Sequence, residues 1–253
     1  MNTRFEQGEV GVVTGGARGI GLGIARRLAE QGMTVALLDR DTAALDASVS
    51  ALTAEGLSVI GVTVDLTDSK AVNAAFEEVG SRAGKVGYLV NNAGVVRDMR
   101  FLKMADEDWD LVVDTNLRSQ FLCCRAALPG MLERGHGRIV NISSRAWLGG
   151  FGQANYSAAK GGVVSLTRSL AIEFAAKGVT VNAIAPGIVD TPLFREFAPE
   201  VQAKLKDSVP VRRIGTAEDI ANAVGFFVDP ASSYVTGQTL YVCGGRSLSS
   251  ASV

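Results

Sequence analysis

Apolar and polar positions follow two patterns that alternate along the chain. Short apolar runs bounded by polar residues or glycine predict seven strands, at Val10–Val13, Thr34–Leu38, Ser58–Asp65, Tyr88–Val90, Arg138–Ile142, Thr180–Ala185 and Thr239–Val242. The longer segments between them carry apolar residues at helical spacing. In the first such segment, Ile20, Ile24 and Leu28 recur every four residues, and Gly32 provides a stop signal after them. The chain is therefore expected to alternate between strands and helices.

This alternation predicts an α/β fold: a doubly wound (Rossmann) sheet of about seven parallel strands with helices on both faces. No repeat or composition break divides the 253 residues, so one domain spanning residues 1–253 is expected. Ligands of such sheets bind at the carboxyl ends of the strands, where the strand order reverses. Those strand ends are where chemically active residues are expected.

Composition excludes several classes of function. The 25 Lys and Arg residues nearly balance the 26 Asp and Glu residues, so no net charge favours nucleic acid or a membrane as a partner. Cys123, Cys124 and Cys243 offer no disulfide framework, and neither a signal peptide nor a membrane-spanning run is evident, so a cytoplasmic protein is expected. His136 is the only histidine, which argues against a metal site or a Ser-His-Asp triad.

A glycine-rich segment, TGGARGIG, follows the first strand. Gly15, Gly19 and Gly21 form the pattern GxxxGxG, which allows a tight turn and a close approach of the backbone to a pyrophosphate at the start of the next helix. The same glycines are also compatible with close packing alone. Their position between a strand and a helix favours a dinucleotide.

The second strand ends at Asp39, 18 residues after Gly21. An acid at about this distance binds the adenosine ribose hydroxyls and repels the 2′-phosphate of NADP, so NAD is expected as the cofactor, with NADP less favoured. Arg18 and Arg40 flank Asp39 and would be able to neutralise such a phosphate.

Polar residues also follow the fourth and fifth strands. Asn91 and Asn92 are suited to bonding the backbone of neighbouring strands, and a serine at a strand end is compatible with a helix cap or turn unless a ligand needs its hydroxyl. Tyr156, 13 residues after Ser143, and Lys160 occupy one helix face in QANYSAAK. A lysine one turn away favours the phenolate form of the tyrosine.

These motifs together resemble the classical short-chain dehydrogenase/reductases over nearly the whole chain. The resemblance rests on TGGARGIG, NNAG, Asn116 in DTNL, Ser143, the Tyr156–Lys160 pair and PGIVDT at 186–191, in that family's order and spacing. It implies hydride transfer between a nicotinamide and a carbonyl or alcohol carbon, with Tyr156 as acid or base and Ser143 as donor to the substrate oxygen. Lys160 would lower the pKa of Tyr156 and bind the nicotinamide ribose, and Asn116 would hold a water that connects Lys160 to solvent.

The same resemblance implies a set of cofactor-binding positions and an assembly. The positions are Gly15, Arg18, Gly19, Ile20, Gly21, Asp39, Asp65, Leu66, Asn91, Gly94, Tyr156, Lys160, Ile188 and Thr191. A homotetramer is implied, with the predicted long helices Glu107–Arg134 and Gln153–Lys177 available to pair between subunits. Cys243 stands where relatives often carry Asp, and it is expected to be a small residue packed at a subunit contact.

The segment at about 187–215 is long for a connection and is expected to be a lid over the substrate. Its apolar residues, and others from a facing segment, either line a substrate pocket or pack the lid onto the body: Leu193, Phe194, Phe197, Leu205, Trp147, Leu148 and Phe151. Arg145 and Arg195 are candidates for contact with a substrate carboxylate or phosphate, or are simply solvated.

An NAD-dependent oxidoreductase that interconverts a secondary alcohol and a ketone is the expected function. The alternative is a 3-oxoacyl-thioester reductase, because NAGVVRDMRFLKM and GQANYSAAKGG resemble segments of 3-oxoacyl-[acyl-carrier-protein] reductases, which generally use NADPH. Arg134 and Lys177 would then form a dock for an acidic carrier protein. A non-catalytic NAD sensor is disfavoured because Ser143, Tyr156 and Lys160 are all present.

Overall fold

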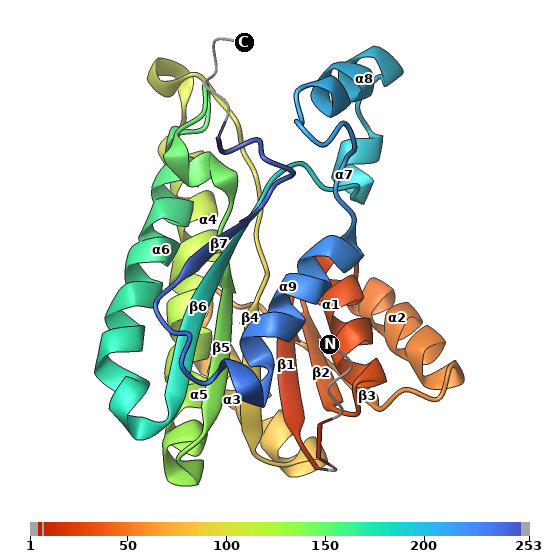
Figure 1. Cartoon of the computed structure of the whole chain (residues 1–253), viewed down its shortest axis with the longest axis vertical. Coiled ribbons are helices and arrows are strands. Elements are labelled where there is room, and N and C mark those ends of the chain that lie inside the picture. Colours follow the sequence, from red (N-terminus) through yellow and green to blue (C-terminus); the bar gives the residue numbers. More distant parts are fainter. Residues whose placement is uncertain (1–4, 7, 249–253) are drawn as a thin grey trace.

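The computed structural model describes residues 5–6 and 8–248, and its centre is a seven-stranded parallel sheet (Figure 1). The strands are β1 (Val10–Thr14), β2 (Thr34–Asp39), β3 (Val59–Thr63), β4 (Val86–Asn91), β5 (Gly137–Ile142), β6 (Val179–Pro186) and β7 (Thr239–Val242). Their order is β3-β2-β1-β4-β5-β6-β7, so the direction of winding reverses between β1 and β4. The predicted fold class and strand positions are confirmed, with the third strand shorter than expected.

Helices cover both faces of the sheet. They are α1 (Gly19–Glu30), α2 (Thr42–Ala54), α3 (Ser69–Ala83), α4 (Asp106–Val113), α5 (Ser119–Arg134), α6 (Ala154–Phe174), α7 (Pro192–Arg195), α8 (Pro199–Asp207) and α9 (Ala217–Val228). One core cluster packs α1 and α9 against one face, and a second packs α3 and α5 against the other. Successive residues of a strand point to opposite faces, which places Val13 in the first cluster and Val12 in the second.

The helix expected over 107–134 is interrupted. A π-helical turn, Asp114–Arg118, separates α4 from α5, and the N–H of Ser119 donates to the carbonyl of Asp114. The amide of Asn116 donates to the carbonyls of Val112 (2.9 Å) and Val95 (2.8 Å). The turn therefore holds Asn116 against the loop that follows β4, and π-helical turns of this kind often occur at functional sites.

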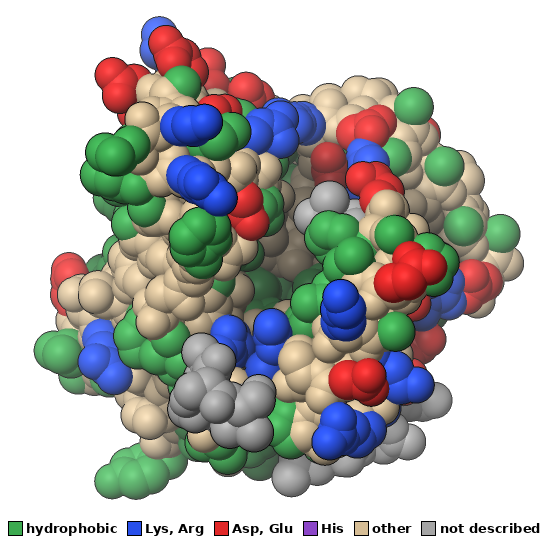
Figure 2. Space-filling view, turned by 90° about the horizontal axis from the view of Figure 1, so that it is seen from above, with side chains coloured by type: hydrophobic (Ala, Val, Ile, Leu, Met, Phe, Trp, Pro, Cys, Tyr) green, Lys and Arg blue, Asp and Glu red, His purple; other side chains and the backbone are tan. Residues whose placement is uncertain are grey.

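The segment between β6 and α9 rises above the carboxyl edge of the sheet and carries α7 and α8 (Figure 1). A bridge between Val189 and Gly215 joins its two ends. Figure 2 looks down on this edge and shows a hollow beside the segment, with apolar side chains inside it and Lys and Arg side chains around its rim. Among the described residues, no helix is long and apolar enough to cross a membrane.

Candidate active site

The glycine-rich turn after β1 adopts a conformation that side chains would disrupt. Gly15 (φ 62°) and Gly19 (φ 55°) have left-handed backbone angles. A Cβ on Gly15 would lie 2.9 Å from the Cα of Ala93, and one on Gly21 would lie 2.1 Å from the carbonyl oxygen of Gly15. The turn thus packs closely against both α1 and the loop after β4.

The N-terminus of α1 fits a bound pyrophosphate. Its N-cap residue, Arg18, makes no side-chain capping bond, and no acidic residue lies in the first turn. By contrast, Asp41, Asp68 and Thr216 cap α2, α3 and α9 with their side chains. The first N–H groups of α1, including that of Ile20, are therefore available to an anion.

Asp39 lies at the end of β2, beside this turn. Its carboxylate accepts hydrogen bonds from the N–H groups of Ala17 (3.2 Å) and Asp41 (3.1 Å). Arg18, which was expected to be available to a 2′-phosphate, instead forms an ion pair with Asp41. The structure therefore fixes the position of the Asp39 carboxylate and pairs Arg18 with Asp41.

Asp65 and Leu66 follow β3, next to Asp39 in the sheet. The Asp65 carboxylate accepts bonds from the N–H (2.9 Å) and hydroxyl (2.7 Å) of Thr67, which hold its pKa below the usual range, and the charge of Arg40 adds to this effect. Leu66 is buried. This places both residues at the edge where an adenosine bound by Asp39 would lie.

Lys160 is buried in α6 with 2% of its surface exposed. Its ammonium group donates to the carbonyl of Ile142 (2.9 Å) and lies 5.7 Å from the centre of the Tyr156 ring. Burial lowers the pKa of Lys160 to about 7. A nearby negative charge, such as a phenolate, would raise that pKa again, so the two side chains are positioned to titrate as a pair.

Tyr156 is half-buried at the first turns of α6. Burial raises the pKa of its phenol, a hydrogen bond with the Ser144 side chain lowers it, and the charge of Asp98 raises it slightly, so that the net pKa lies above the usual value. Tyr156 is therefore a phenol in this state, and it would need further positive charge beside it to lose its proton near neutral pH.

Ser144, and not Ser143, contacts Tyr156. Ser143 is buried, and its hydroxyl donates to the carbonyl of Lys160 (2.8 Å), which fixes α6 against β5. Ser144 has an extended backbone (φ −164°, ψ 150°), and its hydroxyl accepts a bond from the N–H of Ala146 (3.1 Å) and lies close enough to the phenol of Tyr156 to lower its pKa. The expectation that Ser143 meets the substrate oxygen does not agree with this geometry, because neighbouring residues of an extended chain point in opposite directions.

Asn116 and Gly94 lie beside Lys160. A Cβ on Gly94 would lie 2.5 Å from the Oδ1 of Asn116 and 3.5 Å from the ammonium nitrogen of Lys160. This Oδ1 is buried and has no hydrogen-bond partner among the described residues. The arrangement is suited to a water between Asn116 and Lys160.

Asn91 at the end of β4 and Asn92 directly after it join β4 to the neighbouring strands. The amide of Asn91 donates to the side-chain oxygen of Asn141 (2.9 Å) in β5, and Asn92 donates to the carbonyls of Thr14 (3.0 Å) and Gly15 (3.1 Å). Asn91 is fully buried within the sheet. The Asn91 side chain therefore joins β4 to β5, and the Asn92 side chain holds the glycine-rich turn.

The start of the lid lies over the glycine-rich turn. A Cβ on Gly19 would be 3.8 Å from both Thr191 and Pro192. Thr191 caps α7, and the carbonyl of Ile188 accepts a bond from the N–H of Gly215 (3.0 Å). Ile188 and Thr191 thus lie at the same edge of the sheet as the glycines.

Cys243 packs inside the chain, because a Cβ on Gly187 would meet its Cα at 2.8 Å. Burial raises the pKa of its thiol, but hydrogen bonds with Ser247 and with backbone groups outweigh this and lower it. No group of three or more His, Cys, Asp or Glu residues able to hold a metal occurs in the described part of the chain.

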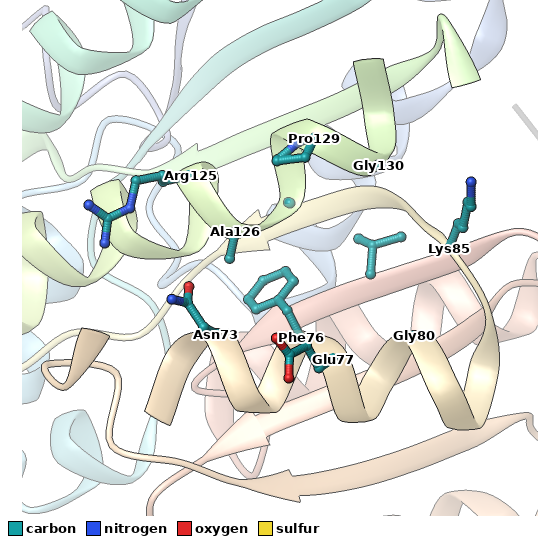
Figure 3. A pocket seen from close by; sticks show the side chains of 11 residues that line it. Asn73, Phe76, Glu77, Gly80, Lys85, Arg125, Ala126, Pro129 and Gly130 are labelled. Atoms are coloured by element: carbon teal, nitrogen blue, oxygen red, sulfur yellow. The ribbon is translucent and has the colours of Figure 1, made fainter. Parts of the chain in front are cut away.

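A cavity of about 360 Å³ lies elsewhere, between α3 and α5 (Figure 3). Its lining includes Asn73, Phe76, Lys85, Arg125 and Pro129. Lys85 precedes β4, so this cavity belongs to the amino ends of the strands, opposite the edge where Tyr156 lies. The cavity is therefore separate from the candidate active site.

Known proteins resemble the chain over almost its full length. The family model described as "Enoyl-(Acyl carrier protein) reductase" matches residues 15–247. The (2S)-[(R)-hydroxy(phenyl)methyl]succinyl-CoA dehydrogenase subunit BbsD of Thauera aromatica is 45% identical over 96% of this chain and 98% of its own. The 3-oxoacyl-[acyl-carrier-protein] reductase FabG of Escherichia coli is 39% identical over 94% and 97%.

The fold is also found among solved structures. A proposed gluconate dehydrogenase from Agrobacterium tumefaciens superposes with a TM-score of 0.93 at 34% identity, covering 96% of this chain and 98% of that one. The comparisons of sequence and of fold point to the same family. The chain therefore belongs to the classical short-chain dehydrogenase/reductases, oxidoreductases that use a nicotinamide cofactor to act on CH–OH and keto groups.

Proposed function

We propose that this chain is an NAD-dependent oxidoreductase that interconverts a secondary alcohol and a ketone. The observation that carries this proposal is the contact between Ser144 and Tyr156, with the ammonium of Lys160 buried 5.7 Å from the phenol ring. These groups provide a proton donor, a hydrogen-bond donor and a cation around one point, which is what reduction of a carbonyl requires.

In this proposal, the nicotinamide supplies or accepts the hydride when bound. Tyr156 gives its proton to the substrate oxygen during reduction and removes it during oxidation. Ser144 donates a hydrogen bond to the same oxygen and stabilises its developing charge. Lys160 becomes fully charged as the phenolate forms, and the free Oδ1 of Asn116 positions a water through which the proton exchanges with solvent.

The preference for NAD rests on the residues at the end of β2. Asp39 is held where it would accept hydrogen bonds from the ribose hydroxyls, and Arg18 is paired with Asp41. A 2′-phosphate would meet two carboxylates next to the exposed Arg40. This arrangement favours NAD over NADP.

A 3-oxoacyl-thioester reductase is the second candidate, supported by the 39% identity to E. coli FabG. Both cations that would form a dock for a carrier protein interact with neighbouring side chains of this chain. Arg134 donates to both carboxylate oxygens of Glu9 (2.8 Å each), and the ammonium of Lys177 lies 5.1 Å from the centre of the Phe174 ring. The first proposal is therefore preferred.

We also propose a homotetramer. Apolar side chains are exposed on three helices that lie together on one side of the molecule (Figure 1): Trp109 on α4 (38%), Phe121 on α5 (44%) and Ile172 on α6 (85%). Burial of such side chains between subunits would remove them from water.

The experiment is to measure NADH formation against a panel of secondary alcohols and to compare Ser144→Ala with Ser143→Ala. Ser144→Ala should lose at least ~100-fold in kcat, because it removes a donor to the substrate oxygen. Ser143→Ala is the matched control, and it should keep kcat within about tenfold while losing about 1 kcal/mol of stability with the Lys160 carbonyl bond. Binding of NAD without turnover of any alcohol would identify a sensor instead of an enzyme.

A further inference from the structure

The first turn of α6, which carries Tyr156, begins after a glycine-rich segment. In that segment Gly149 and Gly152 have positive φ angles of 103° and 76°. The N-cap residue of α6, Gln153, makes no side-chain capping bond. Its amide donates instead to the carboxylate of Asp98 (2.8 Å), which is exposed. The first turn is therefore held in place by contacts other than a helix cap.

Asn155 provides these contacts, and its side chain is fully buried. Its amide nitrogen donates to the carbonyls of Arg97 (3.0 Å), in the loop after β4, and of Asp108 (3.3 Å), in α4. Its amide oxygen accepts from the N–H of Tyr156 (2.7 Å), which lies in the first turn, where N–H groups have no acceptor within the helix. One amide therefore joins the backbone of Tyr156 to two other elements of the fold.

Asn116, which is expected to hold a water in the route of the proton, makes a matching pair of bonds from the π-helical turn. Its amide nitrogen donates to the carbonyls of Val95, in the loop after β4, and Val112, in α4. Both asparagines are fully buried, and α4 packs against α6 (Figure 1). The loop after β4 is thus joined to α4 at two points, and Asn155 makes the one that is next to Tyr156.

We propose that Asn155 is a positioning residue for the reaction, which fixes the phenol of Tyr156 relative to α4 and the loop after β4. This proposal rests on the proposed function, in which Tyr156 transfers the proton. The position of the phenol matters because a displacement of about 1 Å is able to lower turnover about 100-fold. The Asn155 amide is occupied by backbone groups, so it acts through Tyr156 and not on the substrate.

The simplest competing explanation is that Asn155 only satisfies buried carbonyls and stabilises the fold. Asn182 in β6 offers a direct comparison, because it is also fully buried, donates to the carbonyl of Val235 (2.8 Å) and accepts from the N–H of Gln238 (3.0 Å). Neither bond involves α6 or the loop after β4. Asn182→Ala is therefore the matched control for removal of a buried amide that bonds to backbone.

The experiment measures oxidation of 1-phenylethanol, 2-octanol and ethyl 3-hydroxybutyrate by NAD in Asn155→Ala and Asn182→Ala. Asn155→Ala should lower kcat at least about 30-fold and change KM for the alcohol and Kd for NAD less than about threefold. Asn182→Ala should keep kcat within about threefold of wild type. Both variants should lose thermal stability, because each leaves a buried carbonyl without its donor, so the assay is run where circular dichroism shows both to be folded.

A double-mutant cycle tests whether Asn155 acts through Tyr156. In the Tyr156→Phe background, Asn155→Ala should change the remaining turnover less than about threefold, because the group that it positions is already absent. Asn182→Ala should have the same small effect in both backgrounds. Asn155→Ser keeps a hydroxyl that is able to donate to one carbonyl, so it should lose less kcat than Asn155→Ala, and it provides the same cycle if Asn155→Ala does not fold.

An unchanged kcat in Asn155→Ala or in Asn155→Ser together with its cycle would overturn the positioning role, as would a loss that Asn182→Ala matches. An equal loss from Asn155→Ala in both backgrounds would overturn it too, because the effect would then not pass through the phenol. Each of these results leaves the proposed function intact. Near-normal turnover in Tyr156→Phe, or inactivity of wild-type protein toward every secondary alcohol tested, would instead contradict the proposed function.

Discussion

Cofactor choice can be tested at the end of β2, where two carboxylates and one ion pair set the local charge. The first change is Asp39→Asn, which removes the charge but keeps an oxygen that accepts from the N–H groups of Ala17 and Asp41. The second adds Asp41→Asn, which frees Arg18 from its ion pair and retains a side chain able to cap α2 through the N–H of Ala44.

The size of the effect follows from the distances involved. A carboxylate that accepts a bond from the ribose 2′-hydroxyl would lie about 4 Å from a phosphorus at that position, where two unit charges repel by about 4 kcal/mol at an effective dielectric constant near 20. Asp39 is half-buried, so solvent and salt screen part of this repulsion. A remainder of about 1.4 to 3 kcal/mol corresponds to roughly a tenfold to hundredfold preference for NAD.

We therefore expect wild-type protein to prefer NAD by at least tenfold in kcat/KM. Asp39→Asn should shrink this preference by gaining on NADP and losing on NAD. The double variant should gain further on NADP, because the released Arg18 is able to meet the 2′-phosphate. High salt should reduce that gain.

The assay is the ratio of kcat/KM for NAD and NADP with one alcohol, at low and high ionic strength. The control is Asp46→Asn, which removes an exposed carboxylate from α2, the helix that Asp41 caps. It should leave the ratio of kcat/KM for NAD and NADP unchanged. The reasoning is refuted if wild-type protein already prefers NADP, or if freeing Arg18 brings no gain beyond that of Asp39→Asn. The 3-oxoacyl-thioester reductase would then be the preferred function for this chain.

Three further results are expected. Tyr156→Phe should keep the fold and NAD binding, measured by calorimetry, but lose at least ~100-fold in turnover, and near-normal turnover would show that Tyr156 is not the acid or base. The pKa of Lys160 is lowered to about 7 by burial, so this residue opposes folding most strongly below pH 7, and its effect fades as the pH rises toward the unfolded-state value near 10.5. Lys160→Met should therefore raise the free energy of unfolding at pH 7, by at most about 5 kcal/mol, and flatten its rise with pH relative to wild type in denaturant titrations. Lys70→Met, at an exposed position, should do neither. Light scattering at micromolar concentration should show a tetramer that Ile172→Lys weakens, and a fully active wild-type monomer would contradict this.

Local patterns in the sequence were sufficient to predict the fold, the glycine-rich turn and the shared helix face of Tyr156 and Lys160. Strand positions follow from runs of apolar residues, and the parallel order follows from the helices between them. The glycine-rich turn is also a local requirement, because a side chain at Gly15 or Gly21 would collide with backbone. The helical spacing of Tyr156 and Lys160 places them on one face whatever surrounds them.

Only the tertiary structure decided between residues that look equivalent in the chain. Ser143 and Ser144 are adjacent, and their roles depend on which side of an extended segment faces α6. The π-helical turn places Asn116 against the loop after β4, and no periodicity predicts this contact.

The arginines show the same distinction. Arg18 pairs with Asp41, and Arg145 meets Arg246 from 101 positions away, so neither contact is encoded by local spacing. Backbone conformation responds mainly to near neighbours, which is why the sequence alone determined the elements and the turn. Charge pairing and side-chain direction depend on groups brought together by the sheet, and the folded arrangement alone determined which serine contacts Tyr156 and which acid pairs with Arg18.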